Sequence, residues 1–261
     1  MVSYLAMENS RFLECLATDY TLLREASAAA GLEAAVPSCP GWAVTDLVRH
    51  VTEVYLHKVV AIRTGAWPDP WPPDLSGEQP LAAFDRAYRE LTGEFASHPA
   101  DSAALTWYKP DQTVGFWIRR MAQETVIHRM DAELAAGRPL TPAPDDLALD
   151  GIDEALTLFL GYGSASWPED MAELEGEQPA TEGGKEAVTV AAGPAAWTVR
   201  PTPAGVLIEP GADREAVAVV QAAPDPLLRW IWGRSGDEVV TITGDPAWIT
   251  YLRGLIKIFT Q

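Results

Sequence analysis

The sequence is poor in the residues that take a protein to nucleic acid, to membranes or into an oxidising compartment. Cysteine occurs only at Cys15 and Cys39, which is too few for a disulfide framework. Lysine occurs four times, and the 37 acidic residues against 19 basic ones give a formal net charge of −18. A surface this acidic repels phosphate backbones and anionic lipids. We therefore expect neither a nucleic-acid partner nor a membrane partner.

Long apolar runs are also missing. No stretch reaches the ~18 apolar residues of a membrane helix, and the start MVSYLAMENSRF has no basic segment followed by an apolar run. The sequence therefore predicts a cytosolic protein. The glycine-rich nucleotide loops, the GxSxG elbow of hydrolases and the CxxC redox pair are absent as well, which removes three common classes of enzyme.

The first half of the chain has the periodicity of helices. Hydrophobic residues make up 48% of the sequence, enough for a packed core. Apolar residues recur at helical spacing in four segments, at residues 4–31, 45–63, 81–97 and 116–136. The proline-rich run at residues 67–73 predicts an extended loop between the second and third segments. These helices predict an antiparallel four-helix bundle with one long crossover, and bundle interiors commonly hold metal sites.

The second half changes period after a joint at residues 137–146. A helix is predicted at residues 147–160, and the acidic, glycine-rich stretch at 168–186 predicts a solvated loop. Short strands follow at residues 187–192, 197–201, 206–209, 216–222 and 239–243, with helices at 226–233 and 246–259. Asp245 before Pro246 fits a helix N-terminus. We predict a helical domain at residues 1–138 and a small α+β domain at 147–261.

Two histidines and a glutamate form the main candidate site. Glu124 and His128 are four residues apart and therefore share one helical face. His50 lies on another predicted helix, and spacing alone does not show that it meets them. Two histidines with one carboxylate are ligands that divalent metals favour, zinc most often, and three protein ligands leave a position open for chemistry. A hydrogen-bonding role in the core is the ordinary alternative for either histidine.

Several sequence motifs together resemble the mycothiol-dependent maleylpyruvate isomerase family. In the first half these are Val36-Pro-Ser-Cys-Pro-Gly-Trp42 with Asp46-Leu47 and His50 after it, and Glu124-xxx-His128 with Asp131 after it. In the second half they are Leu227-Leu-Arg-Trp-Ile-Trp-Gly-Arg234 and Val239–Gly244 followed by Asp245. The resemblance covers most of the chain. It implies a DinB-like four-helix bundle followed by a small α+β domain similar to sterol carriers.

The same resemblance implies a site and a reaction. Its metal ligands correspond to His50, Glu124 and His128, holding a divalent ion that is usually zinc. Its second domain supplies an arginine for substrate or thiol, which corresponds to Arg234. The implied thiol is mycothiol, and its partner is a small electrophilic molecule. We therefore predict a metalloenzyme that transfers the thiol or isomerises a cis double bond, with no prediction of oligomeric state.

Two other functions stay open at this point. The bundle could hold a metal only for stability in a non-enzymatic binding protein, which would show no thiol-dependent turnover. It could also be a metal-dependent hydrolase that places water in the open position and needs no thiol.

Other polar side chains near the motif have two readings each. His57 is a rival ligand or, more simply, a surface or pocket-wall residue. Glu53, Arg120 and Asp131 could support the ligands, or they could serve only their helices. Cys39 precedes a helix, where thiol pKa values fall, yet no hydrolase signature surrounds it. Three tryptophans in predicted loops are candidates to line a pocket, namely Trp67, Trp71 and Trp107.

Overall fold

The protein is built from two compact units that follow one another along the chain. The structure is a computed structural model that describes residues 7–167, 169, 178–179 and 186–260. One unit is Met7–Pro142, and the described residues from Ala143 onward belong to the other. The first is entirely helical, and the second combines helices with a five-stranded sheet. The predicted fold class, a helical bundle followed by an α+β region, is confirmed.

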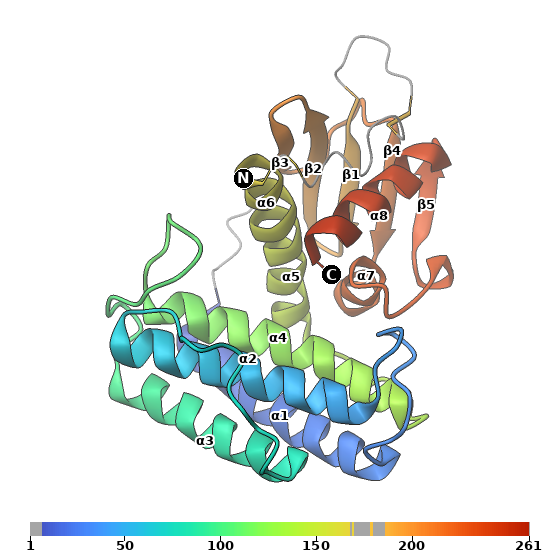
Figure 1. Cartoon of the computed structure of the whole chain (residues 1–261). Helices are drawn as coiled ribbons and strands as arrows, with labels where there is room; N and C mark the ends of the chain where they lie inside the picture. The colour runs from blue at the N-terminus through green and yellow to red at the C-terminus, as the bar shows by residue number, and fades with distance from the viewer. Residues whose placement is uncertain (1–6, 168, 170–177, 180–185, 261) are drawn as a thin grey trace. The chain divides into compact units, whose positions relative to one another are not determined.

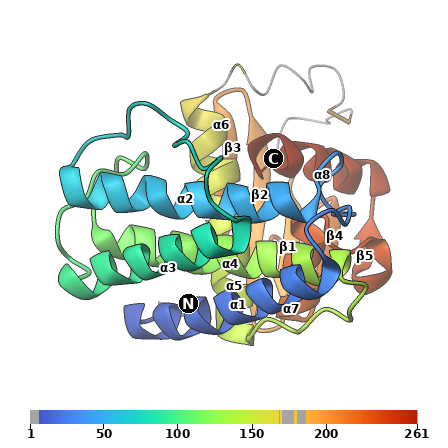
Figure 2. The same cartoon turned by 60° about the horizontal axis from the view of Figure 1, so that its bottom comes forward.

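Four long helices form the first unit (Figures 1 and 2). They are α1 (Asn9–Ala30), α2 (Val44–Thr64), α3 (Pro80–Ser97) and α4 (Val114–Ala135). Helix α1 packs along α4, and α2 packs against both α3 and α4. The connection from α2 to α3 is long and includes the predicted proline-rich loop. All four helices agree with the sequence prediction to within a few residues, and residues 4–6, where the first was predicted to begin, lie outside the described part of the chain.

The ends of the two helices that carry the candidate site are fixed by local hydrogen bonds. At the start of α2, the Asp46 carboxylate accepts from the Ala43 backbone N–H at 2.9 Å. At the other end Gly65 adopts a left-handed conformation, with φ of 67°, that other residues rarely tolerate. Thr113 begins α4 by accepting from the Phe116 N–H. These contacts set where each helix starts and which residues reach the interior.

The seam between α2 and α4 is part of the bundle core. Leu47, Val51 and Val59, which the sequence places on one apolar face of α2, are buried. Deep in the seam the Tyr55 hydroxyl lies 2.6 Å from Thr125 Oγ1, so a polar pair is satisfied within the apolar layer. This packing holds α2 and α4 in one register, which is the requirement for a site shared between them.

The second unit opens with a long helical segment that changes its winding. Helix α5 (Asp145–Asp153) continues as the π-helix η1 (Glu154–Tyr162) and then as the short α6 (Gly163–Ser166). The predicted helix at residues 147–160 therefore exists and runs further. Trp197 donates its indole N–H to Asp153, which ties this segment to the sheet. Most of the predicted loop at 168–186 lies outside the described residues.

The sheet has five strands in the order β3-β2-β1-β4-β5, in which only β1 and β4 are parallel. The strands are β1 (Val188–Ala192), β2 (Ala195–Thr202), β3 (Gly205–Pro210), β4 (Ala218–Ala222) and β5 (Thr241–Gly244). Val190 pairs with Trp197 on one side and with Val220 on the other, so buried side chains align across neighbouring strands. All five predicted strands are present.

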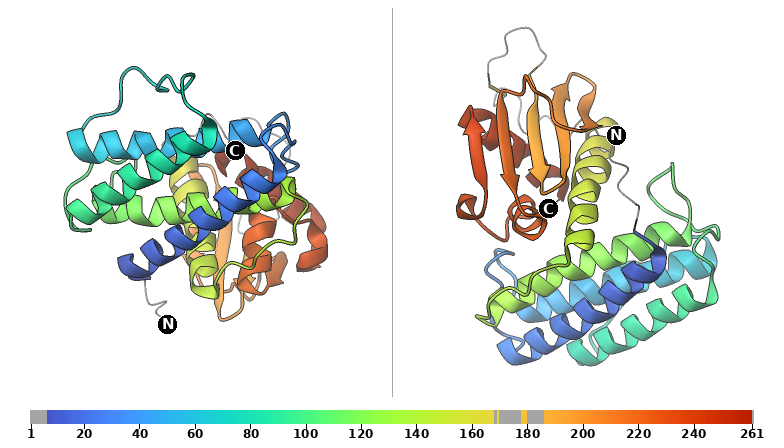
Figure 3. Two further views of the ribbon diagram at one scale, coloured as in Figure 1. Left: turned by 90° about the horizontal axis from the view of Figure 1, so that it is seen from below. Right: turned by 180° about the vertical axis from the view of Figure 1, so that it is seen from behind.

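Helices cover one face of this sheet. Helix α8 (Pro246–Thr260) packs on β1, β4, β5 and η1, while α7 (Pro224–Ile231) packs on α5 and β4. The right panel of Figure 3 shows the strands from the side away from α8. A 3-10 turn, η3 (Asp237–Val239), precedes β5 where the sequence predicted strand. Asp245 accepts from the Ala247 N–H at 2.9 Å and so begins α8 as expected. Within the described residues, no helix is long and apolar enough to cross a membrane.

Candidate metal centre

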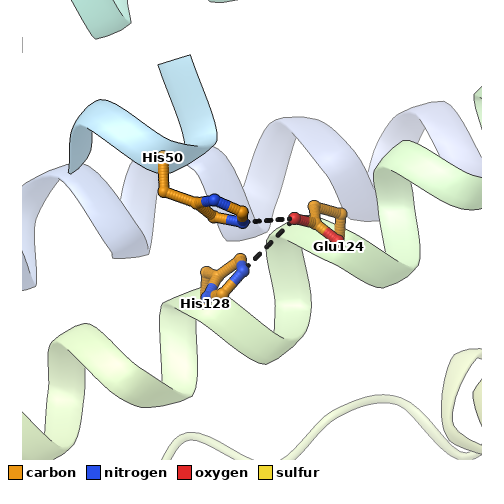
Figure 4. Close-up of side chains that lie close together, drawn as sticks. All are labelled: His50, Glu124 and His128. Atoms are coloured by element: carbon orange, nitrogen blue, oxygen red, sulfur yellow. Dashed lines mark hydrogen bonds and ion pairs between the residues drawn. The ribbon is translucent and has the colours of Figure 1, made fainter. Parts of the chain in front are cut away.

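The structure brings the three predicted ligands together between α2 and α4. His50 comes from α2, and Glu124 and His128 come from successive turns of α4 (Figure 4). Glu124 Oε1 lies 3.2 Å from the Nε2 atom of each histidine, and one possible ligand atom from each of the three lies within 4.8 Å of the others. These residues form the triad discussed below.

The triad is held by polar neighbours on the same helix. Arg120, one turn before Glu124, donates from Nη2 to Glu124 Oε2 at 2.5 Å. Asp131, one turn after His128, lies 2.9 Å from His128 Nδ1 through its Oδ2 atom. The aspartate contact turns His128 Nε2 toward the other two residues, as a carboxylate behind a metal-binding histidine commonly does. Arg120 and Asp131 therefore make the direct contacts with Glu124 and His128 that a supporting role requires.

An ordered loop before α2 completes the surroundings. In the segment Val36–Trp42 the Val36 N–H donates to Trp42 O, and Gly41 takes a φ of 87° that allows the tight return. This turn places Ser38 Oγ 2.5 Å from Asp131 Oδ1 and the Trp42 ring 5.1 Å from the His50 ring. The motif that precedes His50 thus positions a partner for Asp131 and packs an indole on the histidine.

Charge at the triad is strongly coupled. Burial alone would raise the pKa of Glu124, but His128, His50 and Arg120 outweigh it and hold that pKa well below its ordinary value. Burial would likewise lower the pKa of His128, yet Glu124 and Asp131 raise it to about 9. A carboxylate that carries its charge in the interior thus needs a cation beside it. A proton on His128 provides one in the metal-free protein.

The residues present fit a divalent metal ion. A tetrahedral ion with bonds of about 2.0–2.1 Å keeps its ligand atoms roughly 3.4 Å apart, and both nitrogen–oxygen separations here are 3.2 Å. Two imidazoles and a carboxylate suit zinc and similar borderline metals. The site would exchange the His128 proton for the ion, and its charge would remain compensated.

The side chain of His50 marks the open side of the triad. Its relative exposure is 37%, against 15% for Glu124 and 12% for His128. A small molecule from solvent therefore meets the triad beside His50 and Trp42.

Other predicted residues lie away from the triad. His57 contacts the rings of Trp67 and Trp71, which fits the pocket-wall reading and not that of a ligand. Among the described residues, Glu53 forms no hydrogen bond or ion pair with the triad. Cys39 Sγ lies 3.7 Å from Asp131 Oδ2 and so borders the site through that carboxylate.

Arg234 belongs to the second unit, just after α7. It donates from Nη1 to the backbone carbonyl of Trp232 at 2.5 Å, and its own N–H donates to Arg229 O. These contacts fix the turn that ends α7. The role expected for Arg234 in binding substrate or thiol stays a prediction.

Sequence reasoning missed three residues near the triad. Ser38 and Trp42 lie inside the quoted Val36–Trp42 motif, and their closeness to His50 in the sequence was the available signal. Lys58 follows His50 by two helical turns and carries no motif, so its position beside α4 becomes visible only once the two helices are packed.

Comparisons with known proteins agree with the fold. Residues 13–133 match the family described as Mycothiol maleylpyruvate isomerase N-terminal domain. Crystal structures of the mycothiol-dependent maleylpyruvate isomerase and of a histidine-to-alanine mutant of it share 14% and 13% identity with the chain. Each has a TM-score of 0.61 and covers 94% of this chain and 97% of its own. No curated protein matches the sequence.

Proposed function

Because residues 13–133 match the family described as Mycothiol maleylpyruvate isomerase N-terminal domain, we propose that the protein is a metal-dependent enzyme that activates a small thiol. The thiol is mycothiol, and the second substrate is a small electrophilic molecule. The reaction is either transfer of the thiol sulfur or isomerisation of a cis double bond to trans.

The observation that carries the proposal is the convergence of His50, Glu124 and His128 at one point with one side open. Three protein ligands and an accessible fourth position are the pattern of catalytic zinc sites, whereas structural sites are closed by a fourth ligand. Described histidine, cysteine and acidic residues supply no fourth member to this cluster.

The chemistry follows from what an ion at this position supplies. A divalent ion held by the triad would lower the pKa of an incoming thiol and anchor its sulfur. The thiolate adds to an activated alkene carbon, and the former double bond rotates as a single bond. Elimination of the same thiolate then returns the trans alkene, whereas departure of a different group gives S-transfer.

The chain's own residues prepare the site for this step. Asp131 holds His128 in one orientation, and Arg120 does the same for Glu124, so the ligand atoms need little rearrangement. The Trp42 ring packs against the His50 ring, with centroids 5.1 Å apart, and so borders the open side of the triad.

The test combines binding with turnover. Mycothiol is titrated calorimetrically into zinc-loaded and zinc-stripped protein, and turnover of maleylpyruvate and of a panel of activated alkenes is measured with mycothiol, with glutathione and without thiol. We expect mycothiol to bind only the loaded form and turnover to require it. Glutathione should serve poorly, since it lacks the sugar hydroxyls that a site built for mycothiol would bind.

Histidine variants provide the control. The chain has four histidines, and His98 lies outside the triad, hydrogen-bonded to the Glu94 backbone carbonyl. His128→Ala should abolish thiol binding, and His98→Ala should leave it unchanged. Equal mycothiol binding to loaded and stripped protein would favour a binding protein with a stabilising metal. Full turnover without any thiol would favour the hydrolase.

A further inference from the structure

Lys58 is a half-buried cation whose hydrogen-bond partner and aromatic partner, among the described residues, are both uncharged. It lies on α2 beyond the triad, with Nζ 4.8 Å from the centroid of the Trp117 ring and 3.3 Å from His57 Nδ1. An ammonium group has three N–H donors, and one of them is directed to His57. In the described part of the chain, no carboxylate lies within ion-pair distance of Nζ.

Neither contact neutralises the lysine charge. Burial, together with the charge of Lys58, lowers the pKa of His57 to about 4, so this imidazole is uncharged at neutral pH and its Nδ1 accepts from the lysine. Trp117 is fully buried and fixed by a hydrogen bond from its indole N–H to Leu105 O at 3.0 Å. The aromatic face attracts the cation but contributes no negative charge.

The surroundings of Lys58 also hold a second cation. Burial and the nearby charge of Arg120 lower the pKa of Lys58 to about 8, although Glu124 acts in the opposite direction. Arg120 is buried, and its ion pair with Glu124 already uses that carboxylate. The one carboxylate that acts on Lys58 here, Glu124, is thus shared with Arg120 and with both histidines of the triad.

Two exposed indole rings lie beside His57, the hydrogen-bond partner of Lys58. The Trp67 ring lies 5.2 Å and the Trp71 ring 4.8 Å from the His57 ring, and both come from the connection between α2 and α3 (Figure 2). Their side chains are 44% and 40% exposed. Apolar walls beside a desolvated cation suit a carboxylate attached to a small apolar body.

We propose that Lys58 binds a carboxylate of the substrate and thereby sets which electrophiles the triad receives. This inference rests on the proposed function and adds a specificity-determining residue to it. Eight residues of α2 separate His50 from Lys58, about 12 Å along the helix axis, and the flexible lysine side chain shortens the gap. In the proposed binding mode, an acid of metabolite size held at Lys58 extends along α2 toward His50.

The scarcity of lysine makes a direct test practical. The chain has four lysines, so selective 13C labelling of lysine gives four ε-carbon signals by NMR, and Lys58→Met assigns one of them. Succinate, acetate and benzoate are titrated into the zinc-loaded protein. We expect a saturable shift of the Lys58 signal with at least one of these acids, while the signals of Lys109 and Lys257 stay in place.

Matched variants complete the test. Lys58→Met should weaken carboxylate binding at least tenfold by calorimetry, Lys58→Arg should recover part of it, and Lys109→Met, which removes an exposed lysine of the same unit, should have no effect. Unchanged zinc content would show that Lys58→Met has kept the fold. Equal binding by wild type and Lys58→Met, or a Lys58 signal that none of the three acids moves, would overturn the proposal.

The two proposals fail separately. If the zinc-loaded enzyme needs no thiol, the proposed function is wrong, but a carboxylate still shifts the Lys58 signal. If thiol-dependent turnover is present and Lys58→Met keeps the wild-type KM for every acidic substrate, only the role of Lys58 is wrong.

Discussion

At the scale of single residues, the candidate site is a problem of charge compensation. Glu124 is a largely buried carboxylate that meets His50, His128 and Arg120 within hydrogen-bond distance. Removing one partner from such a group is costly because the remaining charge is left in the interior. A metal ion bound by the triad would therefore replace a proton, and on the proposed function hydrogen-ion concentration should control metal binding.

The first prediction concerns this exchange. Glu124 and Asp131 raise the pKa of His128 to about 9, so zinc must displace a proton over the whole neutral range. Zinc affinity of the stripped protein should rise about tenfold per pH unit between roughly pH 7 and 8.5. Competition titrations with a chelator of known pH dependence measure it, with His98→Ala as control. Affinity that is flat above pH 7 would show that His128 binds no proton there.

The same shift fixes the sign of a stability effect. A histidine whose folded pKa is raised stabilises the protein fully below its unfolded pKa of about 6.5 and loses that contribution as pH rises to about 9. The stripped protein should therefore lose thermal stability across this window relative to zinc-loaded protein, as calorimetric Tm values would show.

A second prediction concerns Asp131, the carboxylate behind His128. Asp131→Asn keeps the size of the side chain but removes the charge that orients the imidazole, so zinc affinity should fall about 10–100-fold. Asp101→Asn, at an exposed aspartate of the same unit, should leave it unchanged. Zinc content after equilibrium dialysis against a chelator measures both. Wild-type affinity in Asp131→Asn would mean that the aspartate serves the helix alone.

The sequence could predict the triad but only part of what surrounds it. Glu124 and His128 are local in sequence, and helical spacing alone places them together. His50 joins them only through the packing of α2 on α4, and the expectation that it does so came from family resemblance. Lys58 meets Trp117 through the same packing, and no pattern around it indicates the contact. The types of ligand residue alone predict that metal is released near the ordinary histidine pKa. Glu124 and Asp131 raise the pKa of His128, so the release is now expected at higher pH.

At the scale of secondary-structure elements, α2 carries both the site and the core. His50 contributes to the triad, while Leu47 and Val51 on the same helix are fully buried in the bundle core. Position along one helix therefore couples stability to site geometry, because any shift of α2 moves His50 against α4. Helical periodicity was sufficient to predict this apolar face.

The third prediction separates the two roles of α2. Leu47→Ala should destabilise the bundle by about 2–5 kcal/mol, because a fully buried leucine leaves a cavity. Val54→Ala, at a partly exposed position of the same helix, should cost much less. Chemical denaturation of zinc-loaded variants followed by circular dichroism gives both values. Comparable losses in the two variants would show that α2 does not pack as described.

The sequence predicted which helices and strands exist better than it predicted the winding of the helices or the order of the strands in the sheet. The segment Glu154–Tyr162 forms a π-helix where the sequence predicts an ordinary helix. Its Gly161 approaches β3 closely, and a Cβ there would lie 3.1 Å from the Ile208 side chain. The geometry of this segment thus depends on a contact with a strand far along the chain. For the same reason the order of strands in the sheet, which joins β1 to β4 in parallel, is not contained in the strand periodicity.

At the scale of the whole molecule, the chain joins a helical bundle that carries the candidate metal site to an α+β unit that has no part of the triad. All three candidate ligands lie in Met7–Pro142, and Arg234 lies in the other unit. If the second unit is more than a structural companion, its contribution should appear in turnover and not in metal binding. The family resemblance implies that Arg234 binds substrate or thiol, so a change at Arg234 tests whether the second unit contributes to turnover.

The last prediction therefore concerns Arg234. A guanidinium group can bind a carboxylate through two parallel hydrogen bonds, which lysine cannot reproduce. Arg234→Ala should lower kcat/KM by at least tenfold, while zinc content and the Tm measured without mycothiol stay at wild-type values. Arg234→Lys should recover only part of the lost kcat/KM. Arg214→Ala, at an exposed arginine of the same unit, serves as the control. Because Arg234 also donates to Trp232 O at the end of α7, Tm must be measured alongside the kinetics. Wild-type kcat/KM in a folded Arg234→Ala variant would reduce the arginine to that structural contact and leave the bundle as the sole bearer of the chemistry.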